Sequence, residues 1–397
     1  MANQWDIVVV GAGPAGTSSA ASLAKAGFRV LIVDKYPLPK TKPCAGGLVI
    51  RGLRRLPREI VVPVQRYCRE TRVFVSGQDL CFITKKSNPI IAMTMREDFD
   101  RALADFAVSS GAKLLAPCEV KGIETDDTGS VKVITNEGEF NSNYLVAADG
   151  AVSTVARKIG LSQSAYLVPA VECEIRVDWE TFARFEGAAR FDMGFISGGY
   201  GWVFPKKEHL SVGIGRMRKG KAGLAQSLRR YIEFLGLEKG IVLEKKASVI
   251  SFYIQGRPFA KGRVLLVGDA AGLADPLTAE GISSAILSGQ LAAKAIKSCD
   301  GSARALTKRY VSLLERHILK DVRLARRVGR WVYDYPALMK ALFLVYGERL
   351  CEGMMEVMSG NKSYLGVLAN PFTYLRPFRL GGKATRRTKI DKGRGFR

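Results

Sequence analysis

The start of the chain shows a clear pattern of apolar and polar positions. The run IVVV (7–10) is β-branched and uncharged, which predicts a strand buried on both faces. Small residues over 15–26 predict a closely packed helix, and RVLIV (29–33) predicts a second buried strand. Glycines and Pro14 interrupt the uncharged stretch 7–24, so we interpret it as strand, turn and helix rather than as a membrane span.

Two later segments repeat this order of buried strand, turn and helix. TNEGEFNSNYLVAADGAVSTVARKIG (135–160) predicts a strand that ends in AADG and leads into a basic helix. GRVLLVGDAAGLADPLTAEGISSAILSGQLAAKAI (262–296) predicts a strand, a GDAAG turn and a long helix. Between them, GYGWVFP (199–205) alternates in a way that places three aromatic rings on one face of a strand: Tyr200, Trp202 and Phe204.

The turn after the first strand carries the motif GxGxxG at Gly11, Gly13 and Gly16. The first glycine permits a tight turn, the second lets the backbone approach a pyrophosphate, and the third lets the helix pack against the strand. Asp34 ends the second strand, where a carboxylate can accept hydrogen bonds from an adenosine ribose. This order is typical of a dinucleotide-binding unit for NAD or FAD, and the return of the chain to the same fold at 262–296 favours FAD.

The predicted fold class is therefore α/β. We expect a discontinuous Rossmann-like domain with a parallel sheet, an antiparallel β-sheet domain and a C-terminal helical region. The nucleotide-binding domain is placed at residues 1–75, 90–165 and 255–300, the substrate sheet at 76–89 and 166–254, and the helices with a basic tail at 301–397. The apolar segment ALMKALFLVY (337–346) is too short to span a bilayer and is assigned to a helix.

The charge of the chain is strongly basic. Its 397 residues include 61 Lys plus Arg against 37 Asp plus Glu, a net charge of +24. Such a surface attracts polyanions, and seven arginines at 51–72 and nine basic residues at 376–397 concentrate the charge. Each run fits a solvated surface, and each also fits contact with anionic lipid headgroups. No nucleic-acid-binding module is visible, so we expect no nucleic-acid partner.

Seven cysteines are scattered along the chain: Cys44, Cys68, Cys81, Cys118, Cys173, Cys299 and Cys351. None forms a CxxC pair, so we expect neither a metal site nor an iron–sulfur cluster. The odd count and the lack of a secretory signal predict a reducing cytosol.

The nucleotide motifs, with GDAAG and an RxxFDxxL pattern at 96–103, resemble the FAD-dependent oxidoreductases of the p-hydroxybenzoate hydroxylase structural class. The resemblance implies that Asp269 binds the ribityl chain, that Arg96 contacts the cofactor, and that the helix starting at Gly281 and Ile282 points its positive end at the flavin. It implies a wider cofactor-binding set of Gly11, Gly13, Ala15, Gly16, Asp34, Lys35, Val120 and Asp149. Asp149 and Arg157 also fit a purely structural role, capping the strand–helix junction.

Within this class, three motifs resemble the geranylgeranyl reductase family: KPCAGGL (42–48), GYGWVFP (199–205) and GDAAGLADPLTAEGI (268–282). The resemblance covers residues 5 to about 300. It implies that a loop lies against the flavin, formed by Cys44, Ala45, Gly46 and Gly47. It also implies that a hydrocarbon tunnel is lined by Tyr200, Trp202, Phe204 and Pro205, although the alternation alone fits ordinary core packing as well.

Cys44 is the candidate catalytic residue. An unperturbed thiol has a pKa of about 8.5 and is mostly protonated near neutrality, so it can give a proton as the flavin gives a hydride. Packing beside the ring and reversible oxidation are the alternatives for this thiol. His209 and His317 fall in no motif and are interpreted as structural or surface residues, which leaves Cys44, a tyrosine or ordered water as the proton source.

The resemblance thus predicts an FAD-dependent reductase that saturates C=C bonds of geranylgeranyl or other polyprenyl chains on a membrane lipid or prenyl diphosphate. The chain has no second GxGxxG, so NAD(P)H would dock transiently, or reduced ferredoxin would supply the electrons. We expect a cytoplasmic enzyme that is peripheral on an anionic membrane. One alternative is a monooxygenase or halogenase of the same fold, although halogenases usually carry WxWxIP where this chain has YGWVFP. Another is a prenyl-lipid carrier with structural FAD.

Overall fold

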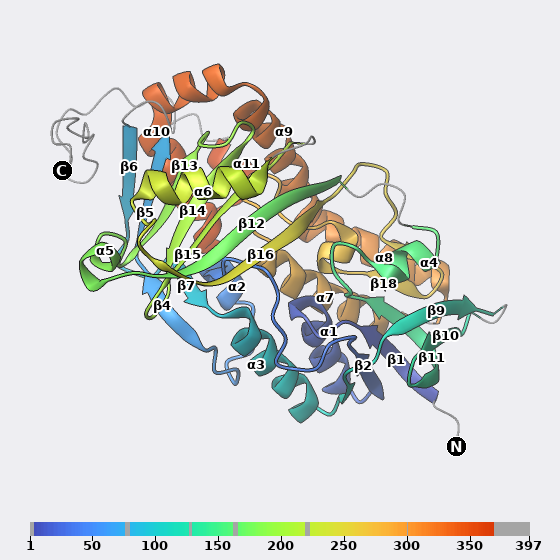
Figure 1. Cartoon of the computed structure of the whole chain (residues 1–397). Coiled ribbons are helices and arrows are strands. Elements are labelled where there is room, and N and C mark those ends of the chain that lie inside the picture. Colours follow the sequence, from blue (N-terminus) through green and yellow to red (C-terminus); the bar gives the residue numbers. More distant parts are fainter. Residues whose placement is uncertain are drawn as a thin grey trace, which may run out of the picture.

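The computed structural model describes residues 4–75, 80–126, 129–161, 166–218, 223–299 and 301–368. The chain begins in a parallel sheet, which lies at the lower right of Figure 1. Its strands run in the order β18 (Val264–Leu266), β11 (Gly138–Ala147), β1 (Gln4–Val10), β2 (Val30–Val33) and β8 (Lys113–Leu115). β17 (Ala260–Lys261) is antiparallel at one edge, and β10 (Val131–Thr135) joins β9 (Val120–Thr125) to β11. The buried β-branched strands thus form the predicted parallel sheet.

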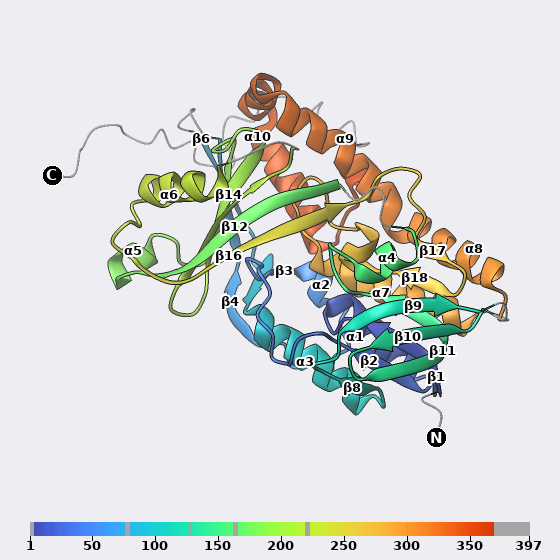
Figure 2. The same cartoon turned by 45° about the vertical axis from the view of Figure 1, so that its right-hand side comes forward.

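Helices cover this sheet (Figures 1 and 2). α1 (Pro14–Ala24) packs against both α3 (Arg96–Ser109) and α7 (Ile282–Lys297). Short elements follow two of the strands: α4 (Thr154–Lys158) after β11, and the 3₁₀ turn η1 (Gly268–Ala271) after β18. The small residues of α1 allow this close packing: a Cβ on Gly289 of α7 would lie only 2.1 Å from the carbonyl oxygen of Ala15 in α1.

A seven-stranded sheet stands above the parallel sheet (Figures 1 and 2). Its order is β16 (Ile241–Phe252), β12 (Tyr166–Arg176), β15 (Leu210–Arg216), β14 (Gly199–Pro205), β13 (Ala188–Met193), β5 (Glu70–Val75) and β6 (Leu80–Lys85). All neighbours are antiparallel except β13 and β5, which are parallel. β5 lies in this sheet although the predicted boundary follows residue 75, because its pairing with β13 joins segments more than a hundred residues apart.

The two faces of the seven-stranded sheet bury different clusters. α6 (Leu224–Leu235) packs on one face through Leu228 and Tyr231, with α5 (Trp179–Ala183) beside it. The other face carries the aromatic residues of β14 and turns toward the C-terminal helices. Both faces of β14 are therefore buried, each against a different hydrophobic cluster.

A small sheet lies between the two large ones (Figure 2). It consists of β3 (Gly47–Val49), β7 (Ile91–Thr94) and β4 (Val64–Cys68), with β7 in the middle. α2 (Ile50–Leu53) follows β3 and packs against α7. The segment before β3 is the KPCAGGL loop, so this sheet holds the loop between the nucleotide fold and the aromatic strand.

The C-terminal region is helical, as the predicted fold class requires. α8 (Ala303–Leu314) continues through a π-helical turn, η2 (Glu315–Leu319), into α9 (Lys320–Asp334), followed by α10 (Pro336–Ser359) and α11 (Tyr364–Leu368). Residues 337–346 lie in α10, which packs on β6 and α9. Within the described ranges, no helix has the length and apolar character to cross a membrane. The basic run 376–397 lies outside the described residues.

Candidate active site

The glycine turn between β1 and α1 has the geometry of a phosphate cradle. Gly11 has a φ of +105°, and a Cβ there would lie 2.3 Å from the carbonyl oxygen of Ala148; a Cβ on Gly16 would lie 1.9 Å from the oxygen of Gly11. Both positions therefore require glycine for packing. A Cβ on Gly13, by contrast, would meet open space at the N-terminus of α1. This opening leaves room for an anionic group against the helix N-terminus.

The carboxylate of Asp34 lies at the end of β2, where the sequence placed it. Its Oδ2 accepts a hydrogen bond of 2.6 Å from the backbone N–H of Ala12 and forms an ion pair with Lys40. Lys40 was not predicted, and it neutralises a carboxylate that is otherwise buried. Lys35 and Val120 were also predicted to bind the cofactor. Lys35 is exposed with its ammonium over the ring of Tyr36, and Val120 is buried at the start of β9.

Asp149 stabilises the start of α4, which is the structural role considered for it in the sequence analysis. Its carboxylate accepts hydrogen bonds from the Ser153 hydroxyl at 2.6 Å and the Val155 N–H at 2.9 Å. Burial raises the pKa of Asp149, while these hydrogen bonds oppose the rise. Arg157 lies on the same helix and reaches the Thr154 hydroxyl at 3.4 Å. Both contacts brace the junction that follows β11.

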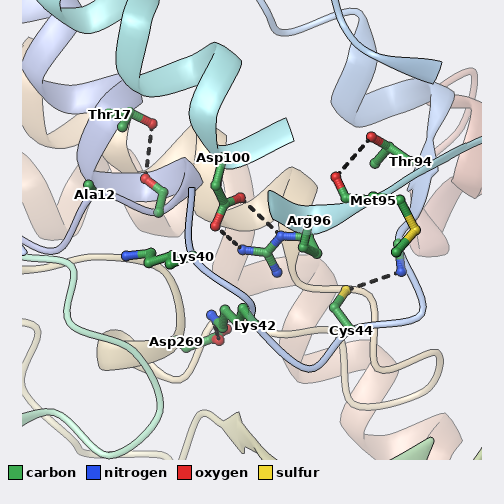
Figure 3. A network of polar contacts seen from close by, with 12 residues as sticks. Ala12, Thr17, Lys40, Lys42, Cys44, Thr94, Met95, Arg96, Asp100 and Asp269 are labelled. Atoms are coloured by element: carbon green, nitrogen blue, oxygen red, sulfur yellow. Dashed lines mark hydrogen bonds and ion pairs between the residues drawn. The ribbon is translucent and has the colours of Figure 1, made fainter. Parts of the chain in front are cut away.

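The late motif brings a second helix N-terminus to the site. Gly281 is the N-cap residue of α7 and Ile282 its first residue, and both line the same cavity as Asp269. The Lys42 ammonium lies 3.5 Å from the Asp269 carboxylate, and Figure 3 shows the two side chains together. A sixteen-residue helix pointing its N-terminus into a cavity favours negative charge there.

Arg96 is held rigidly at the centre of the site. Its guanidinium donates two hydrogen bonds to Asp100, at 3.0 and 2.7 Å, and both side chains are buried. Burial would lower the pKa of Arg96, but Asp100 and Cys44 raise it above its ordinary value. Figure 3 shows Arg96 between Asp100 and Cys44. The arginine therefore stays charged beside the Cys44 sulfur.

The KPCAGGL loop (42–48), called the Cys44 loop from here on, is held by hydrogen bonds on two sides. The Gly46 N–H donates to Cys44 Sγ at 3.4 Å, and the Cys44 N–H donates to the Glu172 carboxylate. Gly46 has a φ of +66°, and a Cβ there would lie 2.0 Å from the Thr94 oxygen; a Cβ on Gly47 would lie 2.7 Å from the ring of Phe204. The two glycines are thus required by protein packing, and with Cys44 and Ala45 they also line the cavity.

The three aromatic residues of β14 form one wall of that cavity. Tyr200, Trp202 and Phe204 are all buried, and the Tyr200 hydroxyl donates to the Thr278 oxygen at 2.6 Å. The ring of Phe191 meets Phe204 edge-on at 5.4 Å between centroids. Pro205 ends the strand and is absent from the described residues that line the cavity.

One cavity of about 370 Å³ joins the parts described so far. It reaches from Pro14, Arg96 and Asp269 past Cys44 to the aromatic wall. Its far side is formed by apolar residues of the C-terminal helices, including Val328, Val332, Phe343, Leu350 and Met354. No sequence motif marks these helical residues, because their role depends on how α9 and α10 pack over the cavity.

The sequence analysis also missed a buried charged cluster behind the Cys44 loop. Glu172 and Glu174 lie on β12 and Lys206 follows β14, and all three are more than nine-tenths buried. Nε2 of His209 lies 3.0 Å from the carboxylate of Glu174. The signal in the sequence is VECEIR (171–176), where acids alternate with apolar residues in a strand that is buried on both faces.

These residues fit FAD. Open space above Gly13 and the N-terminus of α1 suit a pyrophosphate, and the N-terminus of α7, Asp269 and Arg96 border the cavity where a flavin ring would lie. Asp34 suits the ribose, although Lys40 shares its carboxylate. Among the described residues, no cluster of His, Cys, Asp and Glu could hold a metal ion.

Comparisons with known proteins agree with this geometry. The family model "FAD binding domain" matches residues 4–197. A protein of Methanosarcina barkeri described as uncharacterized is 33% identical over 86% of this chain and 87% of its own length. Digeranylgeranylglycerophospholipid reductase 2 of Methanothermobacter thermautotrophicus is 32% identical over 77% of this chain and 82% of its own.

Solved structures agree as well. A geranylgeranyl bacteriochlorophyll reductase-like protein of Thermoplasma acidophilum superposes with a TM-score of 0.74 at 25% identity, over 89% of this chain and 99% of its own. Flavin-dependent halogenases also match, at 17–22% identity, which shows a shared fold alone.

Proposed function

The chain belongs to the geranylgeranyl reductase family of FAD-dependent oxidoreductases, and from this premise we propose that it saturates C=C bonds in the geranylgeranyl chain of a lipid or prenyl precursor. The observation that carries the proposal is the single cavity that joins the cofactor-binding residues to an aromatic and aliphatic wall. An isoprenoid chain offers apolar area and few hydrogen-bonding groups, so such a wall suits it.

Each part of the cavity has a role in this proposal. FAD, when bound and reduced, supplies the two electrons as a hydride. Arg96 and the N-terminus of α7 stabilise negative charge on the reduced ring, and Cys44 Sγ holds a proton beside the alkene. The aromatic wall of β14 and the helices α9 and α10 exclude water and orient the chain. We further propose the domain division predicted above, with β5 assigned to the substrate sheet.

Reaction with a prenyl lipid tests the function directly. The enzyme is photoreduced without oxygen, a geranylgeranyl lipid is added, and the return of the oxidised flavin absorbance is followed. We expect reoxidation and a product heavier by two hydrogens for each bond reduced, measured by mass spectrometry. A product that gains oxygen or halogen would favour the monooxygenase or halogenase. Binding of the lipid without reoxidation would favour the carrier.

We also propose that the corner between α9 and α10 rests on an anionic membrane. Trp331, Tyr335, Leu344 and Val345 are exposed there, and the neighbouring Arg327, Arg330 and Lys340 are exposed as well. Exposed aromatic and aliphatic side chains among basic residues favour contact with anionic headgroups. Val328, Val332 and Phe343 on the same helices line the cavity, so a lipid chain would enter from this side.

Flotation with vesicles that contain anionic lipid tests this surface. The double variant Trp331→Ala, Tyr335→Ala should bind less than the wild type, and raised salt should weaken both. Trp179→Ala is the matched control, because Trp179 is 70% exposed on α5. Equal loss in the control and the double variant would refute the surface. For the electron donor we propose NAD(P)H or reduced ferredoxin, and the rate of flavin reduction by each separates the two.

A further inference from the structure

The buried charged cluster behind the Cys44 loop is not used by the mechanism above. Glu172 lines the cavity, while Glu174, next on the same face of β12, faces His209, whose side chain is 16% exposed. The cluster therefore extends from the cavity to the edge of the protein. Burying several ionisable groups together costs free energy unless each has a partner. The presence of this cluster beside the cavity therefore suggests that it has a function.

Lys206 and Glu172 hold the Cys44 loop through its backbone. The Lys206 ammonium donates to the carbonyl oxygens of Ala45 at 2.6 Å and Thr94 at 2.9 Å, and the Glu172 carboxylate accepts the Cys44 N–H. The loop is thus connected to both β7 and β12. A change of charge at Glu172 acts directly on the residue that carries the thiol.

The three buried ionisable groups Glu172, Glu174 and Lys206 shift one another's pKa values. Lys206 and His209 lower the pKa of Glu174 in spite of its burial, so Glu174 is the anionic partner. Burial and the charge of Glu174 raise the pKa of Glu172 to about 7, although Cys44 N–H, Lys206 and Lys246 of β16 oppose the rise. Burial lowers the pKa of Lys206, and the carboxylates oppose this. Glu172 is therefore the carboxyl group that can gain and lose a proton near neutral pH.

We propose that Glu172 is the proton reservoir of the active site, which recharges the Cys44 thiol, and that Glu174 and His209 return a proton to it from the surface. This inference rests on the proposed function. For each bond reduced, the alkene gains a hydride from reduced FAD, which is oxidised, and a proton from Cys44 Sγ–H. The O–H bond of Glu172 then breaks to restore the S–H bond. Water outside His209 supplies the replacement proton, so one proton and two electrons are consumed.

Glu172 acts through Cys44, so its test needs a readout that a structural role would not change. Glu172→Gln keeps an oxygen for the Cys44 N–H but cannot release a proton. Glu172→Asp keeps a titratable group, and Glu180→Gln, exposed on α5, is the matched control. The first readout is the infrared carbonyl band of a protonated carboxyl group in the resting holoenzyme. We expect it to titrate near pH 7 in the wild type and the control, and to be absent in Glu172→Gln.

The second readout is the pH profile of turnover with a geranylgeranyl lipid. The wild-type rate should fall above pH 7, and Glu172→Asp should keep a pH-dependent rate. Glu172→Gln should lose this dependence and be about 10²-fold slower, the size of a lost acid–base contribution. His209→Gln should leave a single turnover unchanged and slow repeated turnovers, because it affects only the return of the proton.

The outcomes separate the reservoir from a structural role and from the function itself. If Glu172→Gln keeps the wild-type pH profile and the carboxyl band, Glu172 only positions the loop and the reservoir is refuted. If Glu172→Gln does not fold, an Asp variant with a flat profile refutes it equally. If no prenyl lipid reoxidises the wild-type flavin, the proposed function fails and the relay fails with it, while a carboxyl band that titrates near pH 7 still assigns the proton to Glu172.

Discussion

Replacing Gly213 by alanine should displace the indole of Trp202 from the cavity wall. Gly213 on β15 lies directly opposite Trp202 on β14. A Cβ at Gly213 would lie 2.1 Å from Cζ2, 2.5 Å from Cε2 and 2.7 Å from Cη2 of the indole. Ordinary contact begins at 3.4 Å, so the nearest atom must move by 3.4 − 2.1 = 1.3 Å. The indole is buried next to Tyr200, so it cannot move this far without disturbing its neighbours.

The expected cost follows from overpacking. Forcing an extra methyl group into a packed core costs about 1–3 kcal/mol, while replacing glycine in a strand recovers roughly 0.5–1 kcal/mol. We therefore expect Gly213→Ala to lower the free energy of unfolding by roughly 0–2.5 kcal/mol, with about 1 kcal/mol as the central value, measured from urea midpoints at constant m-value. Gly223→Ala is the control, because its Cβ would meet only the Gln226 side chain, at 3.8 Å.

A double-mutant cycle identifies the cause of this loss. In a Trp202→Ala background the indole is gone, so Gly213→Ala should be neutral or stabilising. The Michaelis constant for the prenyl substrate should rise in Gly213→Ala if Trp202 forms the wall. An equal loss of stability in both backgrounds would show that the methyl group clashes with something other than the indole, and would refute the packing argument.

Three further predictions concern Glu172, Tyr364 and Ala279. The raised pKa of Glu172, about 7 against 4.5, means that the native state binds its proton more tightly than the unfolded chain, so stability falls as pH rises through this window. Glu172→Gln should remove up to about 3 kcal/mol of that dependence, measured by urea unfolding from pH 4.5 to 8. Tyr364→Phe removes the 2.7 Å hydrogen bond to buried Asp275 and should cost about 1–3 kcal/mol, with exposed Tyr335→Phe unchanged. Ala279 has a φ of +58°, so Ala279→Gly should raise the thermal midpoint, whereas a drop would show that its methyl contacts outweigh the strain.

The parts of the fold predicted from sequence are those that depend on neighbours in the chain. The strand, glycine turn, helix and Asp34 of the nucleotide fold are local, and so is the alternation that places three rings on one face of β14. The pairing of β5 with β13 was not predicted, because it joins segments that lie far apart in the chain. Strand pairing between distant segments leaves no periodic signal in either strand.

Site residues that belong to a sequence motif could be predicted. Residues whose chemistry depends on burial in the folded protein could not. Cys44, Arg96 and Asp269 were found from motifs, and they border one cavity. Glu172 and Lys206 read as ordinary charged residues, because the pKa of each depends on partners from β12, the Cys44 loop and the turn after β14. The role of Gly213 was equally hidden, since its register with Trp202 is what makes a side chain there unfavourable.

The segment before α7 connects the C-terminal helices α9 and α11 to the start of α7 at the cavity. Three tyrosine hydroxyls bind residues 275–278 from three elements: Tyr200 of β14 at 2.6 Å, Tyr333 of α9 at 2.5 Å and Tyr364 of α11 at 2.7 Å. All three are buried, so breaking any of them leaves a polar group without water to replace its partner. We therefore expect a displacement of α9 or β14 to be transmitted to the backbone that leads to Gly281. Such a displacement would change the position of the α7 N-terminus at the cavity.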